Sequence, residues 1–491
     1  MRLSELLDGR SMSPAILAGA DPDVAGLTAD SREVRPGWLF AALPGSRMDG
    51  RSYIDDAVAR GACAVLTTPD ASERIAGRVP LVADSEPRRR LARLAARFYA
   101  VQPETVVAVT GTNGKTSVAE FTRQIWALTG HRAASLGTLG LIVDGKPEGP
   151  SLTTPDPVRL HAVLKGIAER GVTHAVMEAS SHGLHQSRLD GVRVKAAAFT
   201  NLTRDHLDYH GSMDAYRVAK LALFDRVMAA GGTAVLNVDS PDYQDFAAVA
   251  GRRGHRIIGY GRRPGAELRL ANRVARPDGQ SLDLIVLGRA RSVELPLVGD
   301  FQAWNALAAL GLAIATGTPE GEAVDALGRL AGVRGRMERV AVLDNGAAVY
   351  VDYAHTPDAL ETVLNAVRPH TAGKLWCVFG CGGDRDPGKR PMMGAVVGRL
   401  ADRAIVTDDN PRSEDPAAIR AAALAACPGG EEIGDRAEAI RAAVLRLGPG
   451  DVLMVAGKGH EQGQEIKGEL RPFDDATVAR EAAAARSGGP A

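Results

Sequence analysis

The chain has 491 residues and a formal net charge of zero, with 45% hydrophobic and 24% charged residues. This length is too great for a single hydrophobic core and predicts about three domains. The balanced charge provides no global basic field and no acidic tail, so neither a nucleic-acid-binding protein nor a disordered solvating protein is indicated.

The sequence shows no targeting or membrane signal. Its first ten residues, MRLSELLDGR, predict a short amphipathic helix and lack the charged-then-apolar pattern of a signal peptide. No apolar run approaches the length of a membrane span. The four cysteines are dispersed without C-x-x-C pairing, so neither a disulfide framework nor a zinc site is predicted. We therefore expect a soluble cytoplasmic enzyme with no nucleic-acid or membrane partner.

Residues 1–100 predict a small α/β domain. Short apolar segments such as WLFAAL and CAVLTT alternate with helical ones such as RRRLARLAARFYA. The polar stretches at 29–32 and 44–50 have the composition of ordinary surface loops. Pro103 interrupts the helical pattern and marks a linker to the next domain.

The stretch VVAVTGTNGKTS, residues 106–117, carries the clearest signal in the chain. The pattern predicts a short apolar strand, then a glycine turn, then the start of a helix. In this arrangement the backbone N–H groups and the positive end of the helix dipole face one point, where a polyphosphate can bind. Lys115 would reach the outer phosphates of a nucleotide, and the Thr116 hydroxyl would hold magnesium. Val109 replaces the first glycine of the G-x-x-x-x-G-K-[ST] pattern, so an ordinary glycine turn is the alternative. The strand, the helix and Gly111 favour nucleotide binding.

Residues 101–333 predict a doubly wound α/β domain of the P-loop ATPase type, because strands and helices alternate. Glu178 ends a predicted strand, at the edge of the sheet where ligands collect, and is a candidate metal ligand. His206, Asp208 and His210 follow a later strand. Their spacing fits no standard zinc signature, and a further magnesium ligand is favoured over a zinc cluster.

Two more residues of this domain are ambiguous by composition alone. Lys220 has the pattern of an ordinary helical lysine. Asn305 lies at the start of the helix ALAALGLAIA, where it could face an adenine or simply cap or pack the helix.

Residues 334–491 predict a C-terminal Rossmann-like α/β domain. Three predicted strands end in polar loops that carry glycine or proline, which is how an α/β domain presents a binding crevice. The loop GCGGDRD lacks the G-x-G-x-x-G fingerprint, so a second nucleotide site is not predicted. The cations Arg385, Lys389, Arg390 and Arg412 indicate an anionic substrate, although a single solvated loop charge would mean little.

Together these segments resemble the Mur ligase family, ATP-dependent amide-forming enzymes of peptidoglycan precursor synthesis. The matching pieces, in the family's order from about residue 110 to 461, are TGTNGKTS, MEASSHGL, FTNLTRDHLDYHG, AYRVAKLALF, GRMERV, VDYAHTPD, FGCGGDRDPGKRP, DDNPRSEDP and AGKGHE. The pieces DSR and GSRMDGRSYI extend the likeness toward the N-terminus. The resemblance implies three domains, at residues 1–100 for the uridine nucleotide, 101–333 for ATP and 334–491 for the amino acid.

The resemblance also implies roles for individual residues. The expected ATP-binding residues are Gly111, Thr112, Asn113, Gly114, Lys115, Thr116, Ser117, Asn305, Arg336 and Asp352. Magnesium would be held by Thr116, Glu178, His206 and a carbamylated Lys220. The catalytic group would be Lys115, Glu178, His206 and Lys220.

Substrate contacts follow in the same way. The muramoyl dipeptide nucleotide would contact Ser31, Ser46, Arg47, Met48, Thr153, Thr154, Ser180, Gln186 and Arg188. The amino acid would contact Arg390, Asp409, Asn410, Pro411, Arg412, Gly457 and Glu461.

The segment 409–412, Asp-Asn-Pro-Arg, matches the family's diaminopimelate signature. This implies that meso-diaminopimelate is added to UDP-N-acetylmuramoyl-L-alanyl-D-glutamate (UDP-MurNAc-L-Ala-D-Glu) through an acyl phosphate, with ATP as co-substrate, by a monomeric enzyme. A folylpolyglutamate synthetase-like ligase is one alternative, but it would lack the N-terminal domain and this loop. A nucleotide-operated regulatory protein is another, and it leaves Lys220 and the basic C-terminal loops unexplained.

Overall fold

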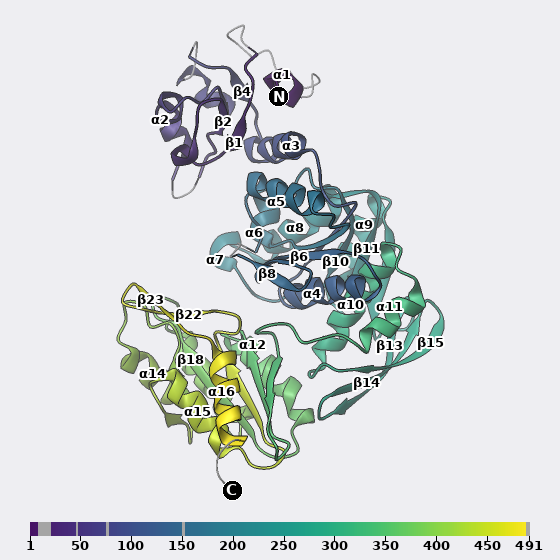
Figure 1. The fold of residues 1–491 in the computed structure, drawn as a ribbon, viewed down its shortest axis with the longest axis vertical. Coiled ribbons are helices and arrows are strands. Elements are labelled where there is room, and N and C mark those ends of the chain that lie inside the picture. Colours follow the sequence, from purple (N-terminus) through teal and green to yellow (C-terminus); the bar gives the residue numbers. More distant parts are fainter. Residues whose placement is uncertain (8–20, 46–47, 75–77, 150–152, 488–491) are drawn as a thin grey trace. The chain divides into compact units, whose positions relative to one another are not determined.

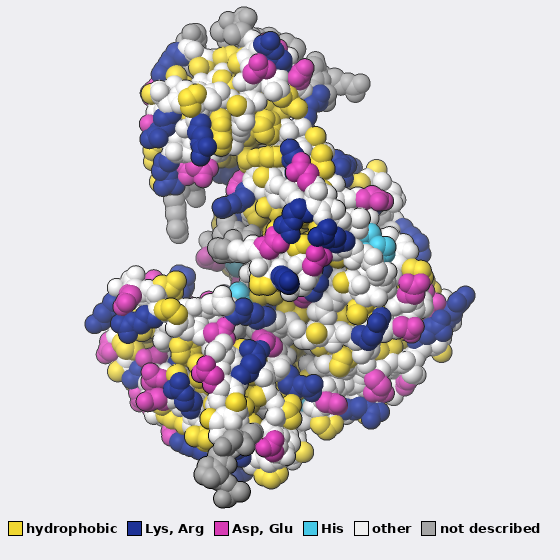
Figure 2. Space-filling view, viewed as in Figure 1, with side chains coloured by type: hydrophobic (Ala, Val, Ile, Leu, Met, Phe, Trp, Pro, Cys, Tyr) yellow, Lys and Arg dark blue, Asp and Glu magenta, His cyan; other side chains and the backbone are white. Residues whose placement is uncertain are grey.

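The computed structural model describes residues 1–7, 21–45, 48–74, 78–149 and 153–487. The chain forms two compact units, Met1–Tyr260 with Gly311–Thr318, and Gly261–Leu310 with Pro319–Ala491. Charged side chains of both signs are interspersed over the face seen in Figure 2, in keeping with the zero net charge. The described helices are all too short or too polar to span a bilayer.

The first unit starts with a small parallel sheet of order β1-β2-β3-β4 (Figure 1). Its elements are α1 (Leu3–Leu6), β1 (Gly26–Thr28), β2 (Trp38–Ala41), α2 (Ile54–Ala59), β3 (Ala64–Thr67), β4 (Leu81–Ala83) and α3 (Pro87–Tyr99). Alternate residues of β3 enter different clusters, Leu66 with Leu91 of α3 and Val65 with Ile54 of α2. Both faces are therefore covered, which explains the continuous apolar runs in these strands.

A larger sheet follows, with β5 at its centre. The order through this part is β12-β11-β10-β5-β9-β6-β7-β8, parallel from β12 to β6 and antiparallel at β7 and β8. The strands are β5 (Thr105–Thr110), β6 (Ala133–Gly137), β7 (Gly140–Val143), β8 (Lys146–Glu148), β9 (His174–Glu178), β10 (Val194–Phe199), β11 (Met228–Asn237) and β12 (Arg256–Gly261). The helices are α4 (Lys115–Leu128), α5 (Pro157–Glu169), α6 (Ser181–His185), α7 (Leu207–His210), α8 (Met213–Ala222) and α9 (Tyr243–Arg252).

This strand order reverses direction at β5. The chain first adds β6 and β9 on one side of β5 and then adds β10 to β12 on the other. In such sheets ligands bind outside the carboxyl ends of the strands at the point of reversal. The register pairs Val109 with Glu178 and Thr110 with Phe199, so the ends of β5, β9 and β10 are level with one another.

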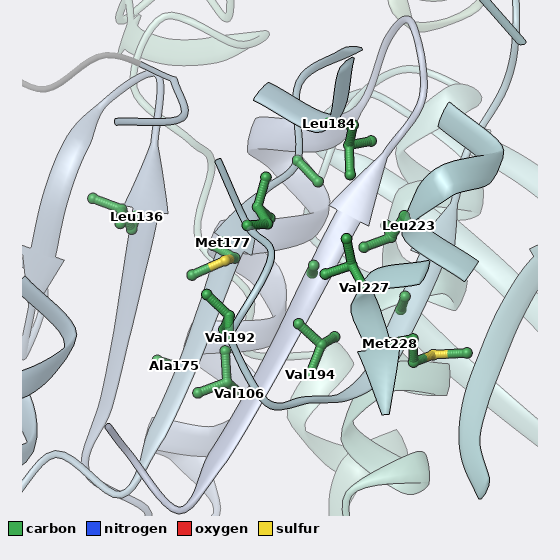
Figure 3. Packing of buried hydrophobic residues seen from close by; sticks show 14 of the residues in the cluster. Val106, Leu136, Ala175, Met177, Leu184, Val192, Val194, Leu223, Val227 and Met228 are labelled. Carbon is green, nitrogen blue, oxygen red and sulfur yellow. The ribbon is translucent and has the colours of Figure 1, made fainter. Parts of the chain in front are cut away.

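The core of this sheet is built from alternate strand residues. Val106 of β5, Met177 of β9 and Val194 of β10 belong to one buried cluster, and Figure 3 shows them together with other members of that cluster, among them Leu136 and Leu223. All of β5 is buried, which agrees with a central strand covered on both faces.

The second unit begins with an antiparallel meander and two helices. These elements are β13 (Leu268–Arg276), β14 (Gly279–Val286), β15 (Arg289–Leu295), α10 (Phe301–Ala315), whose end from Gly311 onward is counted with the first unit, and α11 (Glu320–Leu327). The sequence had predicted only alternating strands and helices up to residue 333, and it did not predict this meander.

The C-terminal sheet has the order β16-β17-β21-β18-β19-β20, in which only β16 of the described strands is antiparallel. Its strands are β16 (Glu338–Val342), β17 (Ala348–Asp352), β18 (Leu375–Cys381), β19 (Arg403–Asp408), β20 (Glu431–Glu432) and β21 (Val452–Ala456), and a separate hairpin is formed by β22 (Gly463–Ile466) and β23 (Glu469–Pro472). The helices are α12 (Pro357–Val367), α13 (Lys389–Leu400), α14 (Pro416–Leu424), α15 (Arg436–Arg446) and α16 (Asp475–Ser487).

Helices cover both faces of this sheet. Phe379 packs with residues of α12, α13 and α14, whereas Val378, its neighbour in β18, packs with residues of α15 and α16. Figure 1 shows α15 and α16 side by side. Because β17, β21, β18 and β19 are neighbouring parallel strands, their carboxyl ends lie at one edge of the sheet, and the predicted polar loops begin there. The α/β architecture expected from the sequence is confirmed.

Candidate functional site

The glycine turn between β5 and α4 has a backbone that only glycine adopts easily. Gly111 has a φ of 147°, and a Cβ at this position would overlap Thr200 Oγ1. Gly114 precedes α4 with a φ of 85°. Asn201 anchors the turn, because its carbonyl oxygen accepts a hydrogen bond from Thr112 N at 2.9 Å and its side chain accepts one from Asn113 N at 2.9 Å.

Two lysines meet at this turn. Lys115 Nζ donates to Gly111 O at 3.0 Å and to Thr112 O at 2.8 Å. Lys220 Nζ donates to the same Gly111 oxygen at 2.7 Å and lies 4.4 Å from the centre of the Tyr216 ring. Lys220 is only 1% exposed, so it differs from the ordinary helical lysine that its sequence context suggested.

The environment of Lys220 disfavours its charge. Burial lowers the pKa of Lys220 well below its usual value, and the Lys115 charge lowers it further. A neutral amine is nucleophilic and can react with carbon dioxide. The sequence pattern alone could not reveal this, because burial of a helical lysine depends on what packs over it.

Glu178 is held at the end of β9 by the loop after β6. It is 2% exposed, and its two carboxylate oxygens accept hydrogen bonds from Thr138 N at 2.7 Å and from Thr138 Oγ1 at 3.2 Å. A Cβ at Gly137 would overlap Glu178 Oε1. Gly137 and Thr138 were missed from sequence, although a Gly-Thr pair directly after the small apolar segment AASL could have pointed to them.

The residues expected to contact the muramoyl dipeptide form one hydrogen-bonded chain. Thr154 Oγ1 donates to Glu178 O at 2.8 Å and accepts from Ser180 N at 3.1 Å. Arg188 donates to Thr154 O at 2.6 Å and to Gln186 Oε1 at 2.8 Å. The network continues to the metal candidate through Thr138, whose hydroxyl lies 3.1 Å from that of Thr153.

His206 immediately precedes α7 and adopts a left-handed backbone, with a φ of 52°. Its Nε2 is 3.4 Å from Asp205 Oδ2, and its ring centre is 4.9 Å from that of His182. Burial lowers the pKa of His206, with smaller contributions from Lys115 and Lys220. The neutral imidazole that results is the form that binds metals. In the part of the chain that the structure describes, no three His, Cys, Asp or Glu side chains are grouped closely enough to hold a metal ion.

Four residues, Ser31, Ser46, Arg47 and Met48, are expected to contact the uridine nucleotide, and the structure describes two of them. Ser31 is 7% exposed and starts a short 3-10 turn, where a plain surface loop was expected. Met48 is 71% exposed. Ser46 and Arg47 lie outside the described residues.

In the second unit, Asp352 ends β17 as a buried carboxylate. It accepts hydrogen bonds from Met337 N at 2.7 Å and Ala354 N at 2.8 Å, and burial raises its pKa. The Arg336 guanidinium stacks 4.7 Å from the centre of the Tyr353 ring. Asn305 is 7% exposed and donates to Gln302 Oε1 at 3.0 Å, within the helix α10.

The basic and polar loops of the C-terminal sheet meet at its carboxyl edge. Asn410 Nδ2 donates to Glu461 Oε2 at 3.0 Å, and a Cβ at Gly457 would lie 2.6 Å from Asp409 Oδ2. Arg412 adopts a left-handed φ of 52°.

Two arginines at this edge are already hydrogen-bonded. Arg412 donates through Nε to Glu465 Oε2 at 3.1 Å and through Nη1 to Gly383 O at 2.7 Å. Arg390 donates to both oxygens of Glu414, at 2.8 and 2.9 Å. Pro411, the residue before Arg412, is buried. A Cβ at Gly383 would overlap its carbonyl oxygen.

Comparison with known proteins identifies the family. Three family models match: the "Mur ligase family, catalytic domain" at residues 23–99, the "Mur ligase middle domain" at 109–313 and the "Mur ligase, glutamate ligase domain" at 335–459. A protein of Caulobacter vibrioides is 56% identical over 93% of this chain and 94% of its own length, and one of Agrobacterium fabrum is 52% identical over 95% and 94%. The chain belongs to the Mur ligase family. Both relatives are named UDP-N-acetylmuramoyl-L-alanyl-D-glutamate--2,6-diaminopimelate ligase.

A solved Mur ligase structure with the same ligase name is also similar. It is 36% identical, covers 94% of this chain and 95% of its own, and superposes with a TM-score of 0.73. The expected family is therefore confirmed, together with its three-domain α/β architecture.

Substituting the glycine of the turn tests its geometry in this Mur ligase. Because a Cβ would overlap Thr200, we expect Gly111→Ala to lower the melting temperature, corresponding to about 1–3 kcal/mol. We also expect ATP affinity, measured by calorimetric titration, to fall about tenfold or more, because the displaced turn no longer points its N–H groups at one place.

The matched control is Gly166→Ala in α5, where a Cβ meets nothing within 4 Å. It should leave ATP affinity unchanged and stabilise the helix by about 0.5–1 kcal/mol. Equal ATP affinity in the two variants would contradict the account of the turn.

Proposed function

We propose that this Mur ligase uses ATP to join meso-diaminopimelate to the D-Glu γ-carboxylate of UDP-MurNAc-L-Ala-D-Glu. The observation that carries the proposal is the identity above 50% over nearly the whole chain with ligases named for these substrates. The Asp-Asn-Pro-Arg segment at 409–412 supports the choice of amine donor. A monomeric enzyme of the cytoplasm is part of the same proposal.

The reaction starts by activating a poor electrophile. A γ-carboxylate oxygen attacks the γ-phosphorus of ATP, the bond to the β-phosphate oxygen breaks, and ADP leaves an acyl phosphate behind. The diaminopimelate amine then attacks the acyl carbon, loses a proton and expels inorganic phosphate, which leaves an amide. Lys115, which is hydrogen-bonded to the turn, would stabilise negative charge on the phosphoryl group in transfer, and no side chain would act as a covalent nucleophile.

The residues around the turn fit magnesium. The Thr116 hydroxyl, the Glu178 carboxylate and the neutral His206 imidazole supply donors of the right kind. Lys220 fits only as a carbamate, since an ammonium would repel the ion, and its neutral amine can attack carbon dioxide and release a proton to give that carbamate. When bound, Mg²⁺ would neutralise charge on the phosphate oxygens. The structure also explains how Glu178 is kept oriented, through Thr138.

The amino-acid loops explain discrimination among amines. Arg412 would pair with the distal carboxylate of diaminopimelate and Glu461 with its distal ammonium. Lysine lacks that carboxylate, so it would leave Arg412 without a substrate partner and should be used poorly. The muramoyl dipeptide would lie along the network of Thr154, Ser180 and Arg188.

One assay tests the proposal. ADP release is measured with ATP, Mg²⁺, UDP-MurNAc-L-Ala-D-Glu and, in separate reactions, meso-diaminopimelate, L-lysine or L-glutamate. We expect release with diaminopimelate and at least about 100-fold lower kcat/KM with lysine. Release with lysine but not diaminopimelate would overturn the donor assignment. In a further reaction a folate acceptor replaces the muramoyl dipeptide, and release there with L-glutamate, with none on the muramoyl dipeptide, would favour the folylpolyglutamate alternative.

A further inference from the structure

Lys458 is a fully buried ammonium between two residues of the proposed amino-acid site. Its side chain is 0% exposed, and Nζ donates to Asn410 Oδ1 at 2.8 Å and to Glu461 Oε2 at 3.2 Å. Asn410 Nδ2 donates to the same Glu461 oxygen at 3.0 Å. The three side chains thus form a closed triangle of hydrogen bonds. An ammonium is costly to bury unless it is paired in this way.

This triangle fixes the orientation of the Asn410 amide. Asn410 Oδ1 accepts from Lys458 Nζ and also from Glu465 N at 3.0 Å. With two donors on the oxygen, the amide nitrogen must face Glu461, and a flipped amide would place its N–H groups against donors. Lys458 therefore determines which group Asn410 presents.

The triangle also fixes Glu461. Both bonds from Lys458 and Asn410 go to Oε2, and within the described residues the structure gives Oε1 no hydrogen-bond donor. The Glu461 side chain is 34% exposed. Its Oε2 is therefore held by Lys458 and Asn410, while Oε1 can face a ligand. A carboxylate held in this way is suited to receive an ammonium group from solvent.

We infer that Lys458 is a positioning residue for the amino-acid substrate, acting by holding Asn410 and Glu461 in their binding orientation. This inference rests on the proposed function. In the sequence Lys458 stands in a Gly-Lys-Gly loop and was not singled out, because a loop lysine is normally solvated. The acyl phosphate forms before the amine is needed, so Lys458 should affect use of diaminopimelate and not the activation step.

The test is steady-state kinetics of Lys458→Met, which keeps the length of the side chain and removes its charge. We expect the KM for diaminopimelate to rise about 10- to 100-fold, because Glu461 and Asn410 lose their anchor. The KM values for ATP and for UDP-MurNAc-L-Ala-D-Glu should stay within about twofold of wild type. Lys374→Met is the matched control, since Lys374 is exposed in the same domain, and it should change none of the three.

A double-mutant cycle separates positioning from a general structural role. In a Glu461→Gln background, Lys458→Met should raise the KM for diaminopimelate by less than it does in the wild type, because one of the two residues that Lys458 holds is already changed. Additive effects of the two substitutions on the KM for diaminopimelate would overturn the inference. So would equal rises in all three KM values, or an unchanged KM for diaminopimelate in Lys458→Met.

Lys458→Arg provides a second variant if the methionine substitution unfolds the domain, which melting curves will show. This variant keeps the positive charge and the hydrogen-bond donors. We expect it to raise only the KM for diaminopimelate, and by less than Lys458→Met does if both variants fold. A rise in the KM for ATP as well would count against a positioning role. If the wild-type enzyme itself releases no ADP with diaminopimelate, the proposed function fails and not this assignment alone.

Discussion

Lys115→Ala is expected to abolish ADP release with every amine, lowering kcat about 1000-fold or more. Lys115 donates hydrogen bonds to two backbone carbonyls of the glycine turn, and in the proposed complex its charge lies beside the phosphates of ATP. Loss of this cation removes stabilisation from the transition state of phosphoryl transfer, a step common to all amine donors. Steady-state ADP release with saturating diaminopimelate and, separately, lysine measures the effect.

A lysine elsewhere in the same unit serves as the control for Lys115. Lys165 lies on α5 and forms an exposed pair with Glu169, at 3.7 Å, so Lys165→Ala should leave kcat unchanged. Melting curves of both variants should resemble that of the wild type. An Lys115→Ala enzyme that kept a tenth of its turnover would refute the role given to this residue.

Arg412→Ala should lower kcat/KM for diaminopimelate about 100-fold or more while leaving the KM for ATP unchanged. The guanidinium now donates to Glu465 and to the Gly383 carbonyl, and in the proposed complex it pairs with the distal carboxylate. Lysine has no such carboxylate, so its kcat/KM should change little and the preference for diaminopimelate should shrink. The variant keeps a side chain with a Cβ at a φ of 52°, so backbone strain is comparable in both enzymes.

The control for Arg412 is Arg399→Ala, which removes an exposed pair with Glu361 in the same domain. It should alter neither substrate's kinetics. Glu465, 43% exposed, remains hydrated when Arg412 is removed, so the melting temperature of Arg412→Ala should fall only slightly. Equal losses with diaminopimelate and lysine would show that Arg412 does not read the distal carboxylate.

Local patterns in the sequence were enough to predict the main elements. The apolar run before Gly111 became β5, and the segment PDALETVLNAV, with apolar residues at helical spacing, forms α12 (Pro357–Val367). Both depend on interactions between near neighbours: Thr356 caps α12 through the Ala359 amide, and Pro357 suits the first helical position. The glycine turn and its candidate role in phosphate binding follow from the same local geometry.

Only the tertiary structure decided which polar side chains are buried and what they contact. The helical pattern around Lys220 gave no sign that the side chain would be 1% exposed against the Gly111 carbonyl, because residues 109 positions apart create that contact. The same holds for Lys458, whose partner Asn410 is 48 residues away.

A buried ion pair makes the point most clearly. Arg436 and Asp475 are both 0% exposed and form two hydrogen bonds of 2.7 Å across 39 residues of sequence, and Arg436 also donates to the carbonyls that end β19 and β21. Composition would place both residues on the surface, as charged residues usually are. The sequence by itself thus determined the main α/β elements, the glycine turn and the family, but not the meander β13 to β15. The fold decided which charged side chains are buried near the site and what they pair with. Burial and pairing depend on segments that are distant in the sequence, and local periodicity does not encode them.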